Sequence, residues 1–516
     1  MIIDRQWNKK EQKLVISYVD KLGNRQFYQK YMHHIKTYEY DENGDCENWD
    51  GRRCKKVFKD TTEYVPNEFD ILEFMYEMDP EMNKMLHAQY FPKLYTWDIE
   101  TEISDDFPDP AIAAQKITSI SLVGPDMSCI VYGLHDMSSE QIELLRKRYL
   151  DWIEDNDFAR NYRDTKLSGK QPKVLYQYFA TEEDMIKHFF TKIIPHIPAL
   201  AGWNSYRFDW QYMWNRAVRL FGKGEAYNML RKASPTGEIG KVGWVEQDGT
   251  KMSSPSPMHV ANLDYMDIVK QYDYSLRPYE SYSLDWVGYA AVKAHKIKYE
   301  GTLQQLYERD PEWYYFYNGI DSLIVNLIHK RLKSLESPCA VDSVTLVPLM
   351  AAMGQVALTT ANVFWTFYND NKHVVYAYDE IERRKIEFAG AFCGCVPGRY
   401  EWNVCDDFAS LYPSQIQTCN FSFENFVYNK VGPDSLGRYT IAPWTEKQLE
   451  EFKKDPNYFV SINGNVYKND KDYCFRKMQR RTKQLRDNYK YTGQRIESEL
   501  LSYINKLIEE KKQQAA

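Results

Sequence analysis

Short stretches of alternating apolar and polar residues, separated by polar turns, run through the first part of the chain. Leu14 to Val19 has the pattern of a strand, and the polar segment 41–45 is typical of a turn. We predict a β-rich or α/β domain over residues 1–90, with part of 335–372 packing on it. No pattern of catalytic groups marks these residues, so we expect a scaffold role, with RNA or DNA contact as the alternative.

A tighter pattern begins at Leu94. The apolar runs 94–99, 117–123 and 129–134 predict three successive strands, and their short links predict an antiparallel meander. A helix is expected over about 181–194, followed by a short strand ending at Gly202.

Further helices and strands follow. Apolar residues at helical spacing come directly after Asp209, which predicts a helix with Asp209 in its first turn. A hairpin is predicted around 241–247, and the segment from Leu263 to Asp267 is typical of a strand that leads into a helix. A long helix is expected over about 312–332, with one buried stripe formed by Ile320, Leu323, Ile324, Leu327 and Ile328.

The composition is that of a globular protein. The chain has 516 residues, 43% hydrophobic and 27% charged, and this length predicts about three or four domains. The net charge of −7 argues against a protein that coats nucleic acid by bulk attraction, so any polyanion site should be local or assisted by metal ions. The cysteines lack zinc-binding spacing, and the sequence has neither a signal-peptide pattern nor a membrane-length apolar run. We therefore expect a soluble intracellular protein with reduced thiols.

Acidic side chains mark the ends of three of these elements. Asp98 and Glu100 are spaced i, i+2, so a strand places both carboxylates on one face. Asp209 lies at a helix start, and Tyr317 and Asp321 are i, i+4 neighbours. Each feature alone has an ordinary explanation, as a solvated strand edge, a helix-start acid or an exposed pair. Together, four carboxylates could hold two Mg²⁺ or Mn²⁺ ions that activate water at a phosphodiester, with the tyrosine hydroxyl orienting that water.

These residues resemble the three motifs of DEDDy 3′–5′ exonucleases, the proofreading type of family B DNA polymerases. The matching segments are Asp98-Ile99-Glu100, Asn204 with Phe208-Asp209, and Tyr317 with Asp321. The resemblance implies a ribonuclease-H-like domain over 91–334. It also implies that the four acids bind the metal ions, that Tyr317 acts in catalysis, and that Asn204 and Phe208 contact the substrate.

A second resemblance concerns the segment from Asp407 to Ser414. It is similar to motif A of family B polymerases, D-x-x-S-L-Y-P-S. This implies that Asp407 is a catalytic residue that binds the two metal ions of the polymerase site. Ser410, Leu411 and Tyr412 would contact the incoming dNTP, with backbone amides at a helix start cradling its triphosphate. The ordinary alternative is an aspartate that only ends a strand.

Basic residues that could grip a triphosphate lie further along. Arg486 and Lys490, spaced i, i+4, resemble residues of the fingers domain. Basic residues from 480 to 483 offer other registers, and solvated side chains are the ordinary alternative. Upstream, residues 388–391 resemble the template-contacting Tyr-x-Gly-Gly/Ala element, with Phe388 in place of its tyrosine.

The two remaining polymerase motifs of the family are not found in the sequence. Motif B is Lys-x-x-x-Asn-Ser-x-Tyr-Gly, and motif C carries Asp-Thr-Asp. We therefore predict a partial palm over 373–465 and partial fingers over 466–516. Either a second polypeptide supplies these motifs, as in a split polymerase, or the chain is a truncated product. An apolar stripe on the last helix is expected to need a partner, at Ile496, Leu500, Leu501, Ile504 and Leu507.

The sequence thus predicts a multidomain α/β protein, the N-terminal part of a DNA polymerase of the T-even-like phage type. We expect metal-dependent removal of 3′-terminal nucleotides and, with a complementing chain, DNA synthesis in replication, with two Mg²⁺ or Mn²⁺ ions per site. The implied partners are primer–template and single-stranded DNA, dNTPs, a second polypeptide and, as a further candidate, a sliding clamp, but no membrane. The implied location is the cytoplasm of an infected bacterium. The alternative function is a nucleic-acid-binding or assembly subunit.

Overall fold

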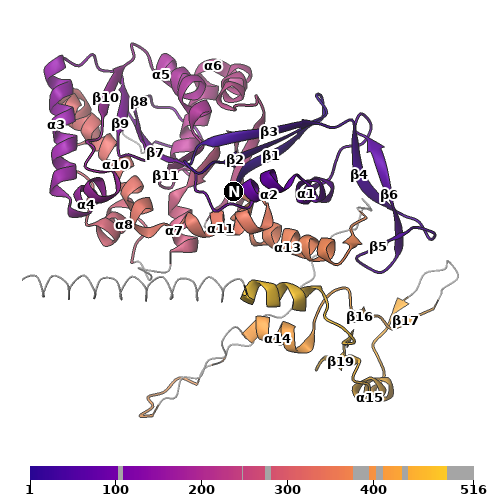
Figure 1. Cartoon of the computed structure of the whole chain (residues 1–516). Helices are drawn as coiled ribbons and strands as arrows, with labels where there is room; N and C mark the ends of the chain where they lie inside the picture. Colours follow the sequence, from indigo (N-terminus) through magenta and orange to yellow (C-terminus); the bar gives the residue numbers. More distant parts are fainter. Residues whose placement is uncertain are drawn as a thin grey trace, which may run out of the picture. The chain divides into compact units, whose positions relative to one another are not determined.

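The structure is a computed structural model that describes residues 1–102, 108–246, 248–273, 280–375, 394, 396–402, 411–432 and 440–484. The chain forms two compact units, whose elements are drawn in Figure 1. Unit 1 comprises Met1–His34, Asp60–Pro66 and Phe74–Leu358, and unit 2 comprises Ile35–Lys59, Asn67–Glu73 and Thr359–Ala516. The predicted division into four domains stays a prediction.

A six-stranded mixed sheet forms the centre of unit 1. Its strand order is β10 (Val174–Tyr178), β9 (Cys129–Gly133), β8 (Ile117–Val123), β7 (Leu94–Thr101), β11 (Ala199–Gly202) and β14 (Ala261–Asp264). Strands β7, β8 and β9 pair antiparallel, which confirms the predicted meander, while β10, β11 and β14 join the sheet in parallel. The multidomain α/β class is confirmed, and this sheet agrees with the ribonuclease-H-like expectation.

The two faces of β7 and β8 carry different residues, because successive side chains of a strand point to opposite faces. On one face, apolar residues such as Trp97, Ile99 and Ile120 join a core cluster that includes residues of helix α6 (Asp209–Ala233). The other face carries Thr96, Asp98 and Glu100 of β7. In the strand register, Asp98 lies opposite Ser121 and Glu100 opposite Ser119. One face of the central strands is therefore polar although it lies inside the protein.

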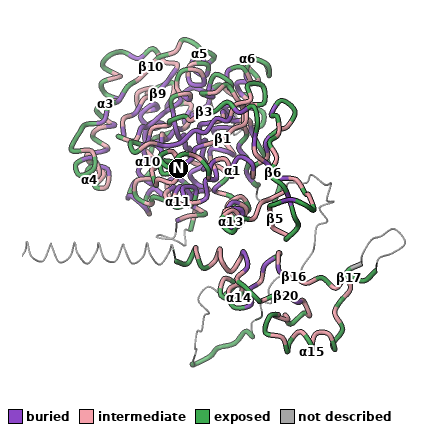
Figure 2. Tube along the Cα trace, turned by 45° about the vertical axis from the view of Figure 1, so that its right-hand side comes forward, coloured by how far each residue is buried: buried purple, intermediate pink, exposed green. Residues whose placement is uncertain are grey.

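Helix α10 (Pro311–Leu332) packs on this polar face. Thr96 Oγ1 donates to the Ser322 carbonyl at 2.8 Å, and Ser121 Oγ donates to the Asn318 carbonyl at 2.9 Å. A single buried stripe was predicted for this helix, and that prediction was too narrow, because every residue from 314 to 328 is buried. The cause is that α3 (Ser139–Asp155), α8 (Leu284–Val292) and α9 (Leu303–Arg309) pack around it as well. Figure 2 shows the buried residues of unit 1 gathered around its strands and α10.

The opposite face of the sheet is covered by two helical segments. The predicted helix at 181–194 is α5 (Glu182–His188), continued by a π-helix (Phe189–Ile193) and a short 3₁₀ turn (Ile194–His196). Helix α6 (Asp209–Ala233) begins at Asp209, in agreement with the prediction, and bends at Gly222, where φ is 77°.

A buried ion pair joins these two helical segments. Arg216 of α6 donates from Nε and Nη2 to the two carboxylate oxygens of Glu182, at 2.8 and 2.7 Å. Glu182 also accepts from the backbone N–H of Ile117 at 2.7 Å, and Arg216 Nη1 donates to the carbonyl of Ala114 at 2.7 Å. The pair therefore fixes the start of strand β8 relative to α6.

The remaining elements of unit 1 surround this core. A hairpin predicted around 241–247 is present as β12 (Ile239–Val245) and β13 (Lys251–Pro257). A three-stranded antiparallel sheet contains β1 (Ile2–Asn8), β2 (Lys13–Val19) and β3 (Arg25–Tyr31). Asp342 in α11 (Glu336–Thr345) accepts from the backbone N–H of Ile2 at 3.2 Å, which ties this helix to β1. The other helices are α2 (Pro80–Leu86), α4 (Asp157–Lys166), α7 (Tyr265–Tyr272), α11 (Glu336–Thr345) and α12 (Leu349–Ala352).

Unit 2 holds smaller sheets and helices. One sheet has the order β15 (Lys372–His373), β5 (Cys46–Asn48), β6 (Arg53–Asp60) and β4 (His34–Tyr40). A second has the order β16 (Phe426–Val427), β20 (Val466–Lys468) and β19 (Tyr458–Val460), and β17 (Lys430–Val431) pairs with β18 (Thr440–Ile441). The helices are α14 (Leu411–Cys419), α15 (Glu446–Lys454) and residues 474–484, with α1 (Glu68–Tyr76) and α13 (Gln355–Asn369) shared between the units. None of the described helices is long and apolar enough to cross a membrane.

Candidate active site

One pocket of unit 1, of about 610 Å³, contains all the residues predicted for the exonuclease site. Strand β7, the loop before α6, the segment around residue 296 and helix α10 each contribute to its lining. The predicted residues in this lining are Asp98, Glu100, Asn204, Phe208, Asp209, Tyr317 and Asp321. Arg207, Lys296 and Tyr299 also line it and were not predicted.

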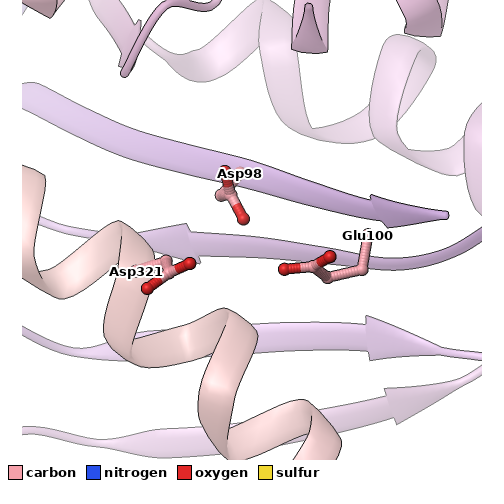
Figure 3. Close-up of side chains that lie close together, drawn as sticks. All are labelled: Asp98, Glu100 and Asp321. Carbon is pink, nitrogen blue, oxygen red and sulfur yellow. The ribbon is translucent and has the colours of Figure 1, made fainter. Parts of the chain in front are cut away.

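Three of the four predicted acids come together in a tight group. Each of Asp98, Glu100 and Asp321 offers one carboxylate oxygen, and these oxygens lie within 4.8 Å of one another. Figure 3 shows the side chains from β7 and α10 turned toward a common space. Asp209 lines the same pocket but is not part of this group. Tyr317 and Asp321 are only 8% and 2% exposed, so they are not an ordinary exposed pair.

An amide side chain holds Asp98 in place. Asn318 Nδ2 donates to Asp98 Oδ2 at 2.8 Å, and Ser119 Oγ donates to Asn318 Oδ1 at 2.7 Å. The asparagine is thus oriented by β8 and positions a carboxylate on β7. The sequence analysis missed Asn318, although its place directly after Tyr317 was a signal that it lies near the site.

Burial and mutual repulsion make these carboxyl groups weak acids in the metal-free protein. Burial, with the negative charge of Asp321 added, raises the pKa of Glu100 to about 8. Burial raises the pKa of Asp209 to about 7, and the charge of Asp264 adds to this shift. The pKa of Asp98 is raised well above its ordinary value by burial and by the charges of Asp209 and Glu100. The pocket therefore lacks enough positive charge of its own to keep all four groups ionised.

Lys296 supplies part of that charge. Its Nζ lies 2.7 Å from Asp321 Oδ2 and 5.3 Å from the centre of the Tyr317 ring. Burial is the largest influence on Lys296 and by itself would lower its pKa. The negative charges of Asp321, Asp98 and Glu100, with Tyr317, together outweigh burial and raise that pKa above its ordinary value. No sequence signal distinguished Lys296 from the other basic residues between 293 and 298.

Asp264 shapes the loop that precedes α6. Its carboxylate accepts from the backbone N–H groups of Asn204, at 3.1 Å, and of Tyr206, at 3.2 Å. Asn204 has a left-handed backbone, with φ of 61°, and its carbonyl accepts from the N–H groups of residues 207 and 208. These bonds turn the chain so that Phe208 and Asp209 reach the pocket. Asp264 also caps the first turn of α7. The sequence predicted only that a strand leads into a helix at this point.

The residues of the pocket fit a divalent cation. Asp321 Oδ1 is buried and accepts no hydrogen bond from the described residues, so it is free to act as a ligand. Carboxylate oxygens are the preferred ligands of Mg²⁺ and Mn²⁺, and a bound cation would relieve the repulsion that raises these pKa values. The donor set does not distinguish Mg²⁺ from Mn²⁺.

The predicted polymerase residues lie in the sequence of unit 2, and several are outside the described residues. These are Asp407, Ser410, Arg486, Lys490 and the segment 388–391. Leu411 and Tyr412 form the start of α14 and are 43% and 70% exposed.

Two of the alternative basic residues make contacts within unit 2. Arg480 pairs with Asp472, and Arg481 stacks on the Trp365 ring. Arg481 also donates to Asn362 Oδ1 at 3.3 Å. Which basic residues grip a triphosphate stays a prediction.

Comparison with known proteins identifies the class of this domain. Residues 53–287 match the family model described as DNA polymerase family B, exonuclease domain. This part of the chain is therefore an exonuclease domain of family B DNA polymerases. The matched range includes Asp98, Glu100 and Asp209 and ends before Tyr317 and Asp321.

The relatives are DNA polymerases. Over 390 residues the chain is 24% identical to the DNA-directed DNA polymerase of Escherichia phage RB69. The aligned region covers 74% of this chain and 40% of the phage protein. The DNA-directed DNA polymerase of Enterobacteria phage T4 is 26% identical over 393 residues, covering 74% and 41% of the two chains. DNA polymerase 1 of Sulfurisphaera ohwakuensis is 23% identical over 346 residues, covering 63% and 34%. The aligned part of the chain thus spans about 40% of the length of the phage relatives.

Proposed function

We propose that this chain is a 3′–5′ exodeoxyribonuclease that removes nucleotides from the 3′ end of DNA, as the proofreading part of a replicative polymerase. The observation that carries this proposal is the group of three buried or half-buried carboxylates, Asp98, Glu100 and Asp321, with oxygens within 4.8 Å of one another. We assign Asp209 to the same site because it lines the same pocket. Two Mg²⁺ or Mn²⁺ ions are the proposed cofactors.

The chemistry is hydrolysis of the last phosphodiester bond. Water attacks the phosphorus atom, the bond to the 3′ oxygen of the preceding nucleotide breaks, and that oxygen takes a proton. Divalent cations held by the four acids would supply the positive charge that makes water a nucleophile at neutral pH and stabilises the leaving oxygen.

The other residues of the pocket have distinct proposed roles. Burial raises the pKa of Tyr317 above its ordinary value, so its hydroxyl stays protonated and can orient the attacking water. Phe208 offers a ring against which the terminal base can stack, and Asn204 offers an amide for a hydrogen bond to the nucleotide. Lys296 favours the ionised form of Asp321 against the effect of burial, and Asn318 keeps the Asp98 carboxylate in one orientation.

Digestion of a 5′-labelled single-stranded oligonucleotide by the purified chain tests this function. With Mg²⁺ present, we expect a ladder of products that shortens from the 3′ end, and no ladder in EDTA. Retention of the oligonucleotide without cleavage would instead support the alternative role, a nucleic-acid-binding or assembly subunit.

Stabilisation by Mg²⁺ should depend on pH. The pKa of Glu100 is raised from 4.5 to about 8 by folding, and that of Asp209 from 3.8 to about 7. Between these ordinary and raised pKa values, the metal-free native state holds protons that the unfolded state has released. The stability of the metal-free protein therefore falls as the pH rises from the ordinary values to the raised ones. Mg²⁺ competes with these protons at low pH and relieves repulsion at high pH. We expect Mg²⁺ to raise Tm by several degrees more at about pH 8 than at about pH 6. The measurement is thermal unfolding at each pH, with Mg²⁺ and with EDTA. An equal shift at both pH values would contradict the assignment of these acids as ligands.

We also propose that residues 373–516 contribute half of a polymerase site, with Asp407 as a metal ligand and Ser410, Leu411, Tyr412, Arg486 and Lys490 contacting a dNTP. The resemblance of the segment 407–414 to motif A and the relationship to DNA-directed DNA polymerases support this proposal. Motifs B and C would come from a complementing polypeptide, and a sliding clamp is a further proposed partner. The phage origin of two relatives supports action in the cytoplasm of an infected bacterium.

The purified chain of 516 residues should not extend a primer by itself. Without the motif C aspartate, the proposed polymerase site lacks a ligand for the ions that carry out nucleotidyl transfer. The measurement is extension of a labelled primer–template with dNTPs and Mg²⁺. The variant Asp98→Ala/Glu100→Ala is used, so that exonuclease digestion does not mask synthesis. Extension by the chain alone would refute the proposed division of the polymerase site.

A further inference from the structure

A second pocket of unit 1, of about 610 Å³, carries an unusual concentration of positive charge. Five lysines line it, and Glu336 is the one acidic residue in this lining. They are Lys21, Lys93, Lys166, Lys330 and Lys333. The whole chain has a net charge of −7, so this cluster stands out against an acidic protein. We call it the lysine pocket.

Most of these charges are not neutralised within the protein. Among the described residues, Lys21, Lys166 and Lys330 make no ion pair. Lys93 donates to Asn24 Oδ1 at 2.7 Å, and Lys333 Nζ lies 3.6 Å from Glu336 Oε1. Burial lowers the pKa of Lys330 to about 8, although the charge of Asp126 acts in the opposite direction. A phosphate group in the pocket would offset the cost of keeping this ammonium charged.

Aromatic side chains lie among the lysines. Phe91 is 41% exposed, and Tyr90 and Tyr162 are half-buried, all three in the pocket lining. Lys330 Nζ lies 5.1 Å from the centre of the Tyr162 ring. Proteins bind single-stranded nucleic acid with aromatic rings beside lysines, because bases stack on the rings and phosphates form ion pairs with the ammonium groups.

The ends of helices explain the positions of three of the five lysines, but not those of the other two. Lys166 and Lys330 lie in the last turns of α4 and α10, and Lys333 follows α10, where positive charge favours a helix. Lys21 and Lys93 are on loops, so no helix explains their presence in the same pocket.

The wall of the pocket that carries Lys21 and Lys93 is fixed by close packing. Gly23 has φ of 80°, and a Cβ there would lie 2.9 Å from the Phe91 carbonyl oxygen. The N–H of Lys93 donates to the Gly23 carbonyl at 2.8 Å. The turn after β2 is therefore clamped against the segment that leads into β7.

The lysine pocket and the candidate active site lie at different positions along the same two elements. Leu94 lines the lysine pocket and Glu100 the active site, and six residues of extended strand span roughly 20 Å. On α10, nine residues separate Asp321 from Lys330, which is roughly 14 Å of helix. The lysine pocket is therefore a separate site.

We propose that the lysine pocket binds a segment of single-stranded nucleic acid away from the active site, with its phosphates on the lysines and its bases on Phe91 and Tyr90. This inference does not depend on the nuclease assignment, because it uses none of the catalytic acids.

The test is fluorescence anisotropy of a 5′-fluorescein oligodeoxythymidylate of about 16 nucleotides. The full chain is used in EDTA, so that metal-dependent cleavage does not occur. The variant Lys21→Glu/Lys166→Glu reverses two exposed charges that make no ion pair with the described residues. We expect the Kd of this variant for the oligonucleotide to rise at least about tenfold at low salt. The slope of the logarithm of the binding constant against the logarithm of the salt concentration should decrease in magnitude by about 1.4, or about 0.7 for each lost phosphate contact.

The matched control is Lys9→Glu/Lys10→Glu, which makes the same charge change at the other end of β2. It should change Kd by less than about twofold, and thermal melting should show both variants folded. Equal affinities of the two variants for the oligonucleotide would overturn the proposal. The proposal would also be overturned if the Lys21→Glu/Lys166→Glu variant lost affinity for dTTP but kept its affinity for the oligonucleotide. The lysine pocket would then bind free nucleotides rather than a strand.

Discussion

Replacing Asp98 and Glu100 together with alanine should lower metal-dependent release of 3′-terminal nucleotides by at least about 10³-fold. Both carboxylates belong to the close group with Asp321, and a loss of about 4 kcal/mol in transition-state stabilisation corresponds to this factor. The fold should remain intact, because the change also removes two groups that repel each other when ionised. The double variant should melt at the same temperature as the wild type in EDTA, or at a higher one.

The measurement compares initial rates on a 5′-labelled oligonucleotide with Mg²⁺. The matched control is Asp151→Ala/Asp155→Ala, which removes two exposed acids from α3 and should leave the rate within about twofold. Cleavage by the Asp98/Glu100 variant at the wild-type rate would place the nuclease site elsewhere. Loss of activity in both variants would show that net charge, rather than the pocket, controls the rate.

Glu182→Ala should lower the free energy of unfolding of unit 1 by about 3 to 5 kcal/mol, the largest stability effect that we expect from a single substitution. Glu182 and Arg216 are only 4% and 6% exposed and form a two-point ion pair. The substitution leaves a guanidinium group inside the protein without its counter-charge. It also removes the acceptor of the Ile117 N–H, at the start of strand β8.

Denaturant unfolding measures this effect, and a double-mutant cycle gives its cause. The cycle compares Glu182→Met, Arg216→Met and the variant with both substitutions. The double variant removes both charges and fills similar volume, so it should be more stable than Glu182→Met alone. If the double variant loses as much stability as the two single variants combined, the ion pair does not contribute as a pair.

Much of the fold could be predicted from the sequence because its signals are local. The meander of β7, β8 and β9 and the start of α6 at Asp209 follow from apolar runs and helical spacing. The burial of α10 on all sides could not be predicted in the same way. It depends on which helices pack around it, and its mixed surface of tyrosine, asparagine and serine side chains conceals this burial in the sequence.

The candidate site could be predicted where a motif carries its residues, and not elsewhere. Asp98, Glu100 and Asp321 come together as the i, i+2 spacing and the motif order indicated. Lys296, Asn318 and Asp264 act through contacts between elements distant in the sequence. A lysine that pairs with a buried acid has no sequence pattern that separates it from a solvated lysine, so only the structure reveals it.

The burial of α10 on all sides determines how the pocket of the candidate active site can open. Local opening of a protein usually begins at exposed, weakly packed segments, whereas α10 is enclosed and hydrogen-bonded to two strands. Its amide hydrogens should exchange with solvent only when the whole unit unfolds. The lifetime of the pocket is therefore the lifetime of unit 1, and any core substitution that speeds global unfolding shortens both by the same factor.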